Sequence, residues 1–255
     1  MVLHLDLYEA DDAAAPWLVF AHGGGFSSGS RDAVPVVAFA EALAERGISV
    51  ASISYRLRQV GAGFGCDVPV AEKREAMLWA AQDMGRAVNY MRHRGAKWIA
   101  VGGTSAGAEA ALLYALQLAP DAAQAVISFS GALEVAEATL TNVPPLLGFH
   151  GTCDGVVPFG RAIHRNCDEE SPGAFLLDGA GALQGCLAAS GQTAVVHAYE
   201  GAGHEVCNGA LTSPAAQNTL VDFILALSNG EKVESDLVYQ SSNSPCASSS
   251  LFPCP

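Results

Sequence analysis

The sequence predicts an α/β fold: a doubly wound, mostly parallel sheet with helices on both faces. Apolar runs typical of strands alternate with helical patterns along most of the chain, which favours a parallel sheet with helical crossovers. Half of the 255 residues are hydrophobic and only 15% are charged, a composition that suits a sheet buried on both faces. This length is sufficient for one large domain with a substantial core.

The chain opens with two strand-like segments, residues 3–8 and 17–21, which we expect to form a hairpin across residues 9–16. Five further apolar runs are expected to form buried strands, and the fifth is taken as the last strand of the domain. These runs are residues 48–54, 98–101, 125–130, 145–149 and 193–199.

Helical periodicity predicts helices in the segments between the strands. The longest expected helix is residues 70–92. Gly47 is expected to end the helix 34–46, and Pro214 fits the first turn of the helix 214–227. The other expected helices are residues 108–118, 157–166 and 183–189.

One domain is expected over residues 1–230, followed by a tail of serine, proline and cysteine over residues 231–255. The change in composition is clearest from Gln240 onward and is typical of a loosely held segment.

The formal net charge of −13 disfavours nucleic acid and anionic membrane surfaces as partners. No apolar run approaches the roughly 20 residues that a membrane-spanning helix needs. The first residues have the pattern of a strand and not of a signal peptide. We therefore expect either a cytoplasmic protein or a secreted one whose targeting segment is absent from this chain. Nothing in the sequence indicates an oligomeric state.

Ser105 is the candidate nucleophile. It lies in the pattern G-x-S-x-G over residues 103–107, between an expected strand and an expected helix. Small residues allow the sharp turn of a nucleophile elbow, which raises the serine oxygen above the sheet at the start of a helix. An oxyanion formed there would meet free backbone N–H groups and the positive end of the helix dipole.

A serine hydroxyl needs a base and a group that orients the base, and after such an elbow the expected chain order is Ser, Asp or Glu, His. Asp154 and His204 each follow an expected strand in this order. In open α/β sheets the carboxyl ends of the strands are where sites form. Asp178 is the substitute candidate for the acid, because the Asp154-Gly155 pair is also typical of a simple turn.

The fourth segment is the run His22-Gly-Gly-Gly25, which follows the second expected strand. An HGGG turn in this place supplies backbone N–H groups to an oxyanion hole. We assign the donors to Gly24, Gly25 and Ala106. Phe26, next in the chain, is expected either to line the acyl pocket or to pack in the core, and His22 to hold the loop by hydrogen bonds.

With these four segments the chain resembles the α/β-hydrolase family of serine esterases, in particular small HGGG-type bacterial hydrolases that include feruloyl- and acetyl-esterase-like enzymes. The matching residues are 22–26, 54–56, 103–107, 150–154 and 201–205. The resemblance implies a triad of Ser105, His204 and Asp154 with no metal or cofactor. It covers roughly residues 3–228, and the absence of a leading strand suggests seven strands or a trimmed chain.

The short stretch between Ser105 and Asp154 leaves no room for a large lid. An open site suits short-chain, aryl or acetyl esters better than long lipid chains. We therefore expect a carboxylic-ester hydrolase acting on a small-molecule ester. The alternatives are an amide, formamide or peptide hydrolase with the same triad, and a noncatalytic binding module that kept the pocket.

Seven cysteines leave at least one thiol unpaired within the chain. Cys153 and Cys207 flank the candidate acid and base, so a disulfide between them is expected, with Cys66 as a rival partner for Cys153 and free thiols as the alternative. Metal binding is not expected, because no C-x-x-C pair occurs and the spacing of His164, Asp168 and His197 favours no site.

Overall fold

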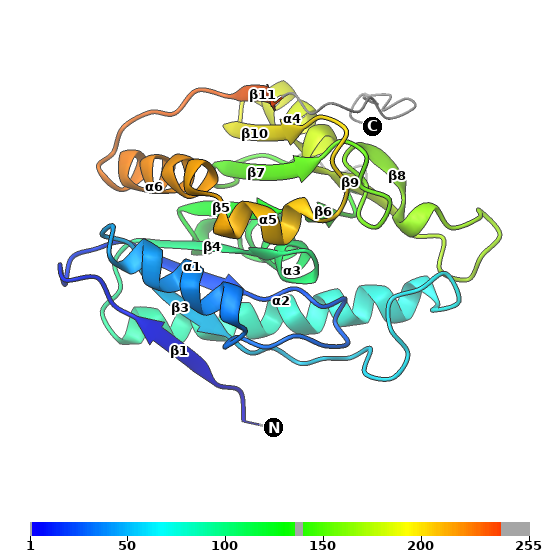
Figure 1. The fold of residues 1–255 in the computed structure, drawn as a ribbon, viewed down its shortest axis with the longest axis horizontal. Helices are drawn as coiled ribbons and strands as arrows, with labels where there is room; N and C mark the ends of the chain where they lie inside the picture. The colour runs from blue at the N-terminus through cyan, green and yellow to red at the C-terminus, as the bar shows by residue number, and fades with distance from the viewer. Residues whose placement is uncertain (1, 136–139, 241–255) are drawn as a thin grey trace.

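The computed structural model describes residues 2–135 and 140–240 (Figure 1). Within these residues an eight-stranded sheet has the order β1-β3-β2-β4-β5-β7-β10-β11, and a second sheet has the order β6-β9-β8. In the large sheet β1 is antiparallel to β3, and every other neighbouring pair is parallel. Helices cover both faces (Figure 1), which confirms the predicted fold class.

The strands are β1 Leu5–Tyr8, β2 Trp17–Ala21, β3 Ser49–Ile53, β4 Ile99–Thr104, β5 Ala125–Phe129, β6 Ala132–Leu133, β7 Leu146–Gly151, β8 Arg161–Ile163, β9 Leu176–Gly179, β10 Ala194–Tyr199 and β11 Asp236–Gln240. The helices are α1 Val34–Ala44, α2 Val70–His93, α3 Ala106–Leu113, α4 Ala180–Ala189, α5 Val206–Thr212 and α6 Pro214–Ser228. Helix α3 continues as a π-helical segment, Tyr114–Leu118.

Two hydrophobic layers hold the helices to the sheet. Apolar side chains of α2, α3 and α4 form one layer, in which Met84 and Leu112 are fully buried. Apolar side chains of α1, α5 and α6 form the other, in which Phe39 and Leu220 are buried. The strands between the layers are apolar on both faces because neither face meets water.

The expected hairpin at the start of the chain is wrong. Strand β1 pairs with β3, with Leu5 opposite Ile53 and Tyr8 opposite Val50. Strand β3 therefore lies between β1 and β2. The helical crossover through α1 brings the chain back beside β2, where β3 takes the inner position and leaves the edge to β1.

The helix expected over residues 157–166 is also wrong. This segment contains the short strand β8 and one turn of 3₁₀ helix, His164–Asn166. Pro158 and Gly160 are poor residues for a helix interior, and the apolar spacing alone conceals that. Strand β8 pairs with β9 in the small sheet, beyond the end of the large one.

The strand expected to be last, residues 193–199, is followed by another. Strand β11 pairs parallel with β10, with Val195 opposite Asp236, so the large sheet has one strand more than the seven expected. The domain limit at residue 230 stays a prediction, although five residues beyond it extend the sheet. Residues 241–255 of the expected tail lie outside the described residues.

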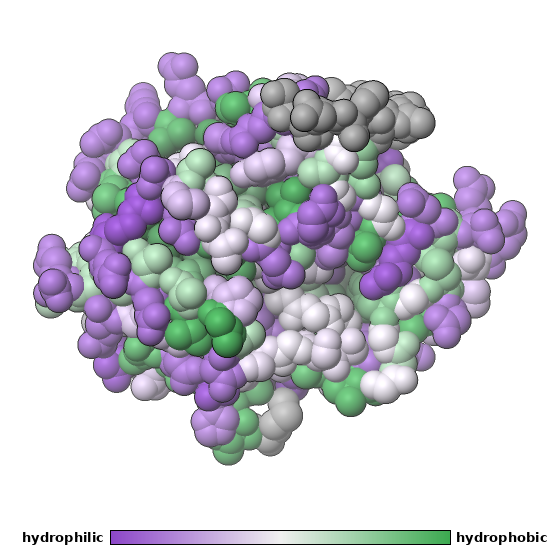
Figure 2. Space-filling view, in the orientation of Figure 1, coloured by the Kyte–Doolittle hydropathy of each residue, from purple (hydrophilic) through white to green (hydrophobic). Residues whose placement is uncertain are grey.

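On the face seen in Figure 2, outside the grey residues, hydrophilic and hydrophobic side chains are interspersed and no hydrophobic area extends across the surface. Among the described residues, none of the helices has the length and apolar character needed to cross a membrane.

Candidate active site

Ser105 occupies the turn between β4 and α3 in a backbone conformation that few residues other than glycine adopt, with φ 49° and ψ −120°. Its N–H donates to Phe129 O at 2.8 Å, which fixes the turn against β5. A Cβ at Gly103 or Gly107 would approach Ala21 O within 2.5 Å and 2.2 Å, respectively. The two glycines of the motif therefore let the elbow pack directly on the end of β2.

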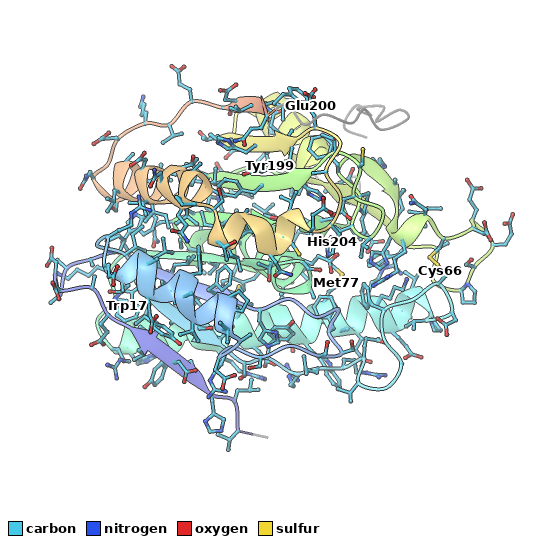
Figure 3. All side chains as sticks on the ribbon, in the orientation of Figure 1. Trp17, Cys66, Met77, Tyr199, Glu200 and His204 are labelled. Atoms are coloured by element: carbon cyan, nitrogen blue, oxygen red, sulfur yellow. A yellow bond between two sulfur atoms is a disulfide. The ribbon has the colours of Figure 1, made fainter. Side chains whose placement is uncertain are left out.

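The three residues of the predicted triad, far apart in the chain, meet at the carboxyl ends of β4, β7 and β10. Ser105 Oγ lies 2.9 Å from His204 Nε2, and His204 Nδ1 lies 2.7 Å from Asp154 Oδ2. Figure 3 shows His204 in the loop that follows β10. A serine, an imidazole and a carboxylate in this chain of contacts can pass a proton from the hydroxyl to the imidazole.

The Asp154 carboxylate is held by more than the histidine. Its Oδ1 accepts from the N–H groups of Val156 and Val157 at 2.8 and 2.9 Å. The buried His150 places Nε2 3.0 Å from Val157 O and 3.4 Å from Asp154 Oδ2. Burial would raise the pKa of Asp154, but hydrogen bonds from His150 and His204 hold it well below its usual range. The carboxylate is therefore ionised and fixed.

The contact with Asp154 shifts the pKa of His204 in the opposite direction. Burial would lower the pKa of His204, but the hydrogen bond to Asp154, a further one to Cys207 and the charge of Asp154 raise it to about 10. The substitute acid Asp178 is elsewhere: it lies in β9 and pairs with Arg161 of β8 at 3.3 Å. Of the two candidates, Asp154 is the one that the structure brings to His204.

The HGGG turn forms a rigid loop beside Ser105. Gly24 has φ 122°, and a Cβ there would lie 2.2 Å from Ser28 O. Within the described part of the chain, the N–H groups of Gly24, Gly25 and Ala106 donate to no acceptor. All three residues line one cavity with Ser105. Free donors around the hydroxyl are the arrangement that an oxyanion hole requires.

His22 and Tyr55 fix the back of this loop. The His22 ring stacks on Tyr55 with 4.5 Å between centroids, and Tyr55 Oη donates to His22 O at 2.8 Å. Burial lowers the pKa of His22, so a neutral ring faces Tyr55. Phe26 is fully buried, 5.1 Å from Phe64 between ring centroids, and does not line the cavity. Of its two expected roles, core packing is the correct one.

The cavity over Ser105 measures about 660 Å³. The HGGG turn and α1 form one side, and the loop with Phe64, the turn with Val157 and the segment with His164 and Arg165 form the other. Glu109, one helical turn after Ser105, also lines it. Glu109 is not predicted from the sequence as a site residue, because only its burial without a partner distinguishes it.

Residues 5–141, more than half of the chain, match the sequence profile of the family described as BD-FAE. The chain belongs to the BD-FAE family. As a member of BD-FAE, an esterase-like α/β-hydrolase family, it is a carboxylesterase-type hydrolase. A search of the curated proteins finds no match to this sequence.

Several solved structures of an esterase from Thermogutta terrifontis share the fold of this BD-FAE chain. The form phosphoramylated by tabun has a TM-score of 0.62 at 22% identity and covers 89% of this chain and 90% of its own. The form phosphorylated by paraoxon has a TM-score of 0.60 at 23% identity and covers 90% of each chain. The propionate-bound form has a TM-score of 0.60 at 22% identity and covers 89% of each.

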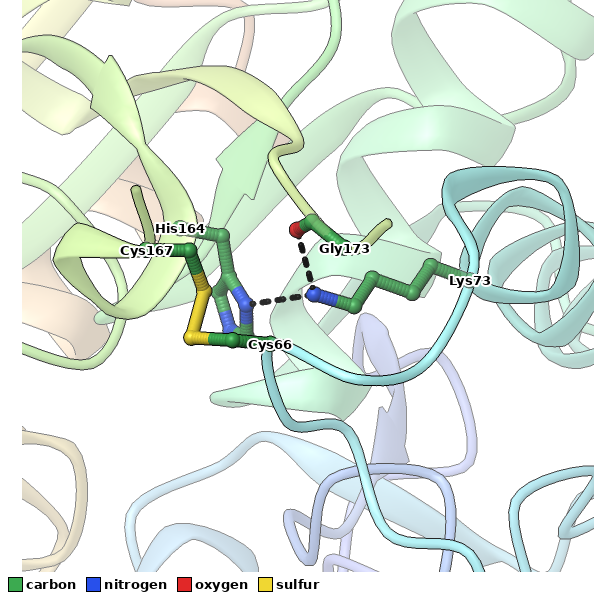
Figure 4. The surroundings of a disulfide bond; sticks show 5 residues. All are labelled: Cys66, Lys73, His164, Cys167 and Gly173. Carbon is green, nitrogen blue, oxygen red and sulfur yellow. Dashed lines mark hydrogen bonds between the residues drawn. A yellow bond between two sulfur atoms is a disulfide. The ribbon is translucent and has the colours of Figure 1, made fainter. Parts of the chain in front are cut away.

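The disulfide expected for this BD-FAE chain between Cys153 and Cys207 is wrong, and so is the rival pairing of Cys153 with Cys66. Cys66 is bonded to Cys167 (Figure 4). Cys207 is a buried free thiol. The pairing depends on which loops meet across the cavity, and the sequence carries no signal for that. The bond ties the loop after Phe64 to the segment after Arg165, so it links two parts of the same cavity wall.

Among the described residues of this BD-FAE chain, no three His, Cys, Asp or Glu side chains are grouped as metal ligands. His164 contacts Lys73, and His197 contacts Gln240 at 3.1 Å. The scattered histidines noted in the sequence have separate structural partners.

Proposed function

We propose that this BD-FAE member hydrolyses carboxylic esters through an acyl-enzyme formed on Ser105, with His204 as general base and acid and Asp154 as the orienting carboxylate. The observation that carries the proposal is the continuous contact from Ser105 Oγ to His204 at 2.9 Å and from His204 to Asp154 at 2.7 Å. No metal or cofactor takes part in this chemistry.

In the first step His204 Nε2 takes the hydroxyl proton while Ser105 Oγ attacks the ester carbonyl carbon. The carbonyl oxygen becomes an oxyanion, and Asp154 stabilises the imidazolium and keeps the proton on Nδ1. The N–H groups of Gly24, Gly25 and Ala106 are assigned to the oxyanion, because they are free and line the cavity beside Ser105.

In the second step His204 gives its Nε2 proton to the leaving alkoxide, and the alcohol departs. Water then takes the place of the alcohol, loses a proton to His204 and attacks the acyl carbonyl. The same donors stabilise the second oxyanion. Release of the carboxylic acid restores the hydroxyl of Ser105.

We assign the substrates to short-chain, acetyl or aryl esters. The active-site cavity is about 660 Å³ and open, which suits short or aryl acyl groups better than long chains. Solved structures of the Thermogutta terrifontis esterase with propionate and with butyrate bound are consistent with this assignment.

The decisive experiment compares the wild-type protein with Ser105→Ala on p-nitrophenyl acetate. Loss of the nucleophile removes the acyl-enzyme route, so we expect turnover to fall by on the order of 10³-fold or more, with an unchanged circular dichroism spectrum. Retention of most of the activity in this variant would refute the assignment of Ser105.

Two further measurements separate the alternatives. Faster cleavage of anilides or formamides than of matched esters would favour an amide hydrolase with the same residues. A fluorophosphonate probe forms an adduct only with an activated serine, so absence of any adduct would favour a noncatalytic binding module.

A further inference from the structure

Glu109 is a buried carboxyl group to which the proposed mechanism gives no role. It lies in the first turn of α3, four residues after Ser105, and its N–H donates to Ser105 O at 2.9 Å. Ser105 is the N-cap residue of this helix, and both side chains line the same cavity. The side chain is almost fully buried, with 2% exposed, and it lines the cavity over Ser105.

The carboxyl group has no hydrogen-bond partner in the described part of the chain, and its Oε1 is buried. Buried polar side chains are almost always hydrogen-bonded, so an unpaired carboxyl oxygen in a cavity wall calls for a partner that the protein does not supply. The position next to the nucleophile makes the substrate the natural source of that partner.

The buried Lys73 does not take this place. Its Nζ lies 2.8 Å from Gly173 O and 3.5 Å from His164 Nδ1 (Figure 4). It also lies 5.3 Å from the centroid of Phe64. Its ammonium is therefore committed to the cavity wall and influences Glu109 only through its field.

These charges decide which group fits Glu109. Burial raises the pKa of Glu109 and the fields of His204, Lys73 and Arg165 lower it, with a net value of about 7. At neutral pH the side chain therefore exchanges between carboxylate and carboxylic acid. A hydroxyl group pairs with both forms because it can donate and accept.

Other groups fit less well. Lys73 and Arg165 would repel an ammonium group, and the ionised form of Glu109 would repel a carboxylate. A hydrocarbon would leave the buried Oε1 without a partner, which is costly.

We propose that Glu109 is a specificity-determining residue that hydrogen-bonds a hydroxyl group of the substrate. The preferred substrates are then esters that carry a hydroxyl close to the carbonyl group, on the acyl or on the alcohol part, because Glu109 and Ser105 line the same cavity. This inference rests on the proposed function, because it names the substrate class of the same site.

The experiment uses two matched pairs of esters. For the acyl part, p-nitrophenyl 3-hydroxybutyrate is compared with p-nitrophenyl butyrate. For the alcohol part, 2-hydroxyethyl butyrate is compared with propyl butyrate, with acid release followed by titration. The readout is the ratio of kcat/KM for the hydroxylated ester to that for its partner, measured for each variant, so that a general loss of activity cancels.

In the wild-type protein we expect a ratio of about 10 or more in one of the two pairs, the size expected for a hydrogen bond to a charged group. In Glu109→Leu and Glu109→Ala the ratio should fall towards 1, whereas Glu109→Gln should keep more of it. The Ala variant serves if the Leu variant does not fold. Glu41→Gln, on the exposed side of α1, should keep the wild-type ratio.

A wild-type ratio near 1 in both pairs would overturn the inference, and so would a ratio that persists in both apolar variants. Either result leaves ester hydrolysis itself intact. Absence of turnover on every ester would instead overturn the proposed function, and this inference with it.

Discussion

His204 Nδ1 lies 2.7 Å from Asp154 Oδ2, and this contact governs the pH at which the site is active. Asp154 raises the pKa of His204 above its ordinary value of 6.5, while burial acts against the shift. The base must be neutral to accept the proton of Ser105, so kcat/KM should rise with pH through the raised pKa of His204. The measurement is a profile of kcat/KM with p-nitrophenyl acetate across about pH 5–11, which extends beyond that pKa.

Asp154→Asn tests the origin of that shift. The amide keeps the shape of the side chain but loses its charge, so the pKa of His204 should fall and the rising limb should move to lower pH. Activity on the plateau should drop by on the order of 10⁴-fold, because the amide favours the wrong tautomer of the imidazole. A limb at or below pH 6.5 in the wild-type protein, or one that Asp154→Asn does not move, contradicts this account.

The HGGG turn, to which we assign the oxyanion donors, offers a matched pair of substitutions. Gly24→Ala places a Cβ 2.2 Å from Ser28 O at φ 122°, so the loop must shift and take its N–H groups with it. Gly25→Ala, at φ 59°, meets no atom closer than 3.7 Å. We expect Gly24→Ala to lose about 10²–10³-fold in kcat, as when one oxyanion donor is removed, and Gly25→Ala to lose much less.

Both variants should bind a fluorescent competitive inhibitor with similar affinity. The loss of kcat would then come from weaker stabilisation of the transition state and not from weaker binding in the ground state. Equal losses of kcat in the two variants would contradict the steric explanation.

The convergence of the site could be predicted from the sequence because it follows from topology. Parallel strands that end in polar or glycine-rich loops bring those loops to one edge, and so the motifs around Ser105, Asp154 and His204 meet. The small residues at 103 and 107 predicted the sharp turn, and the structure adds that both glycines pack against the end of β2.

Pairing partners and cross-links could not be predicted in this way. Strand β1 is next to β2 in the sequence but next to β3 in space, and the apolar pattern does not encode that choice. Strand β11, the segment Asp236–Gln240, is a partly exposed edge strand with polar ends, so it lacks the apolar run of a buried strand. Glu109 was overlooked because only its burial without a partner distinguishes it.

The Cys66–Cys167 disulfide closes a loop of 101 residues and joins two segments of the cavity wall. Cys66→Ser should lower the free energy of unfolding by about 2–4 kcal/mol, because the unfolded chain regains the conformations that the cross-link excludes. The measurement is urea unfolding followed by tryptophan fluorescence.

Cys167→Ser and the double variant Cys66→Ser/Cys167→Ser serve as controls. Each removes the same bond, so all three variants should unfold at similar urea concentrations. An unfolding free energy equal to that of the wild-type protein in the double variant would show that the cross-link does not stabilise the fold.

Replacing a glycine of the elbow should lower the stability of the protein, whereas replacing a glycine at an exposed position of a helix should raise it. Gly107→Ala brings a Cβ within 2.2 Å of Ala21 O, a backbone atom of β2. This atom cannot move without disturbing the sheet, so we expect the free energy of unfolding to fall by several kcal/mol, or the variant not to fold. Gly185→Ala, in α4, meets nothing within 4 Å and should stabilise the protein by about 0.5–1 kcal/mol through helix propensity. Thermal unfolding measures both. If Gly107→Ala proved as stable as the wild-type protein, the close contact between elbow and strand would not be a requirement of the fold.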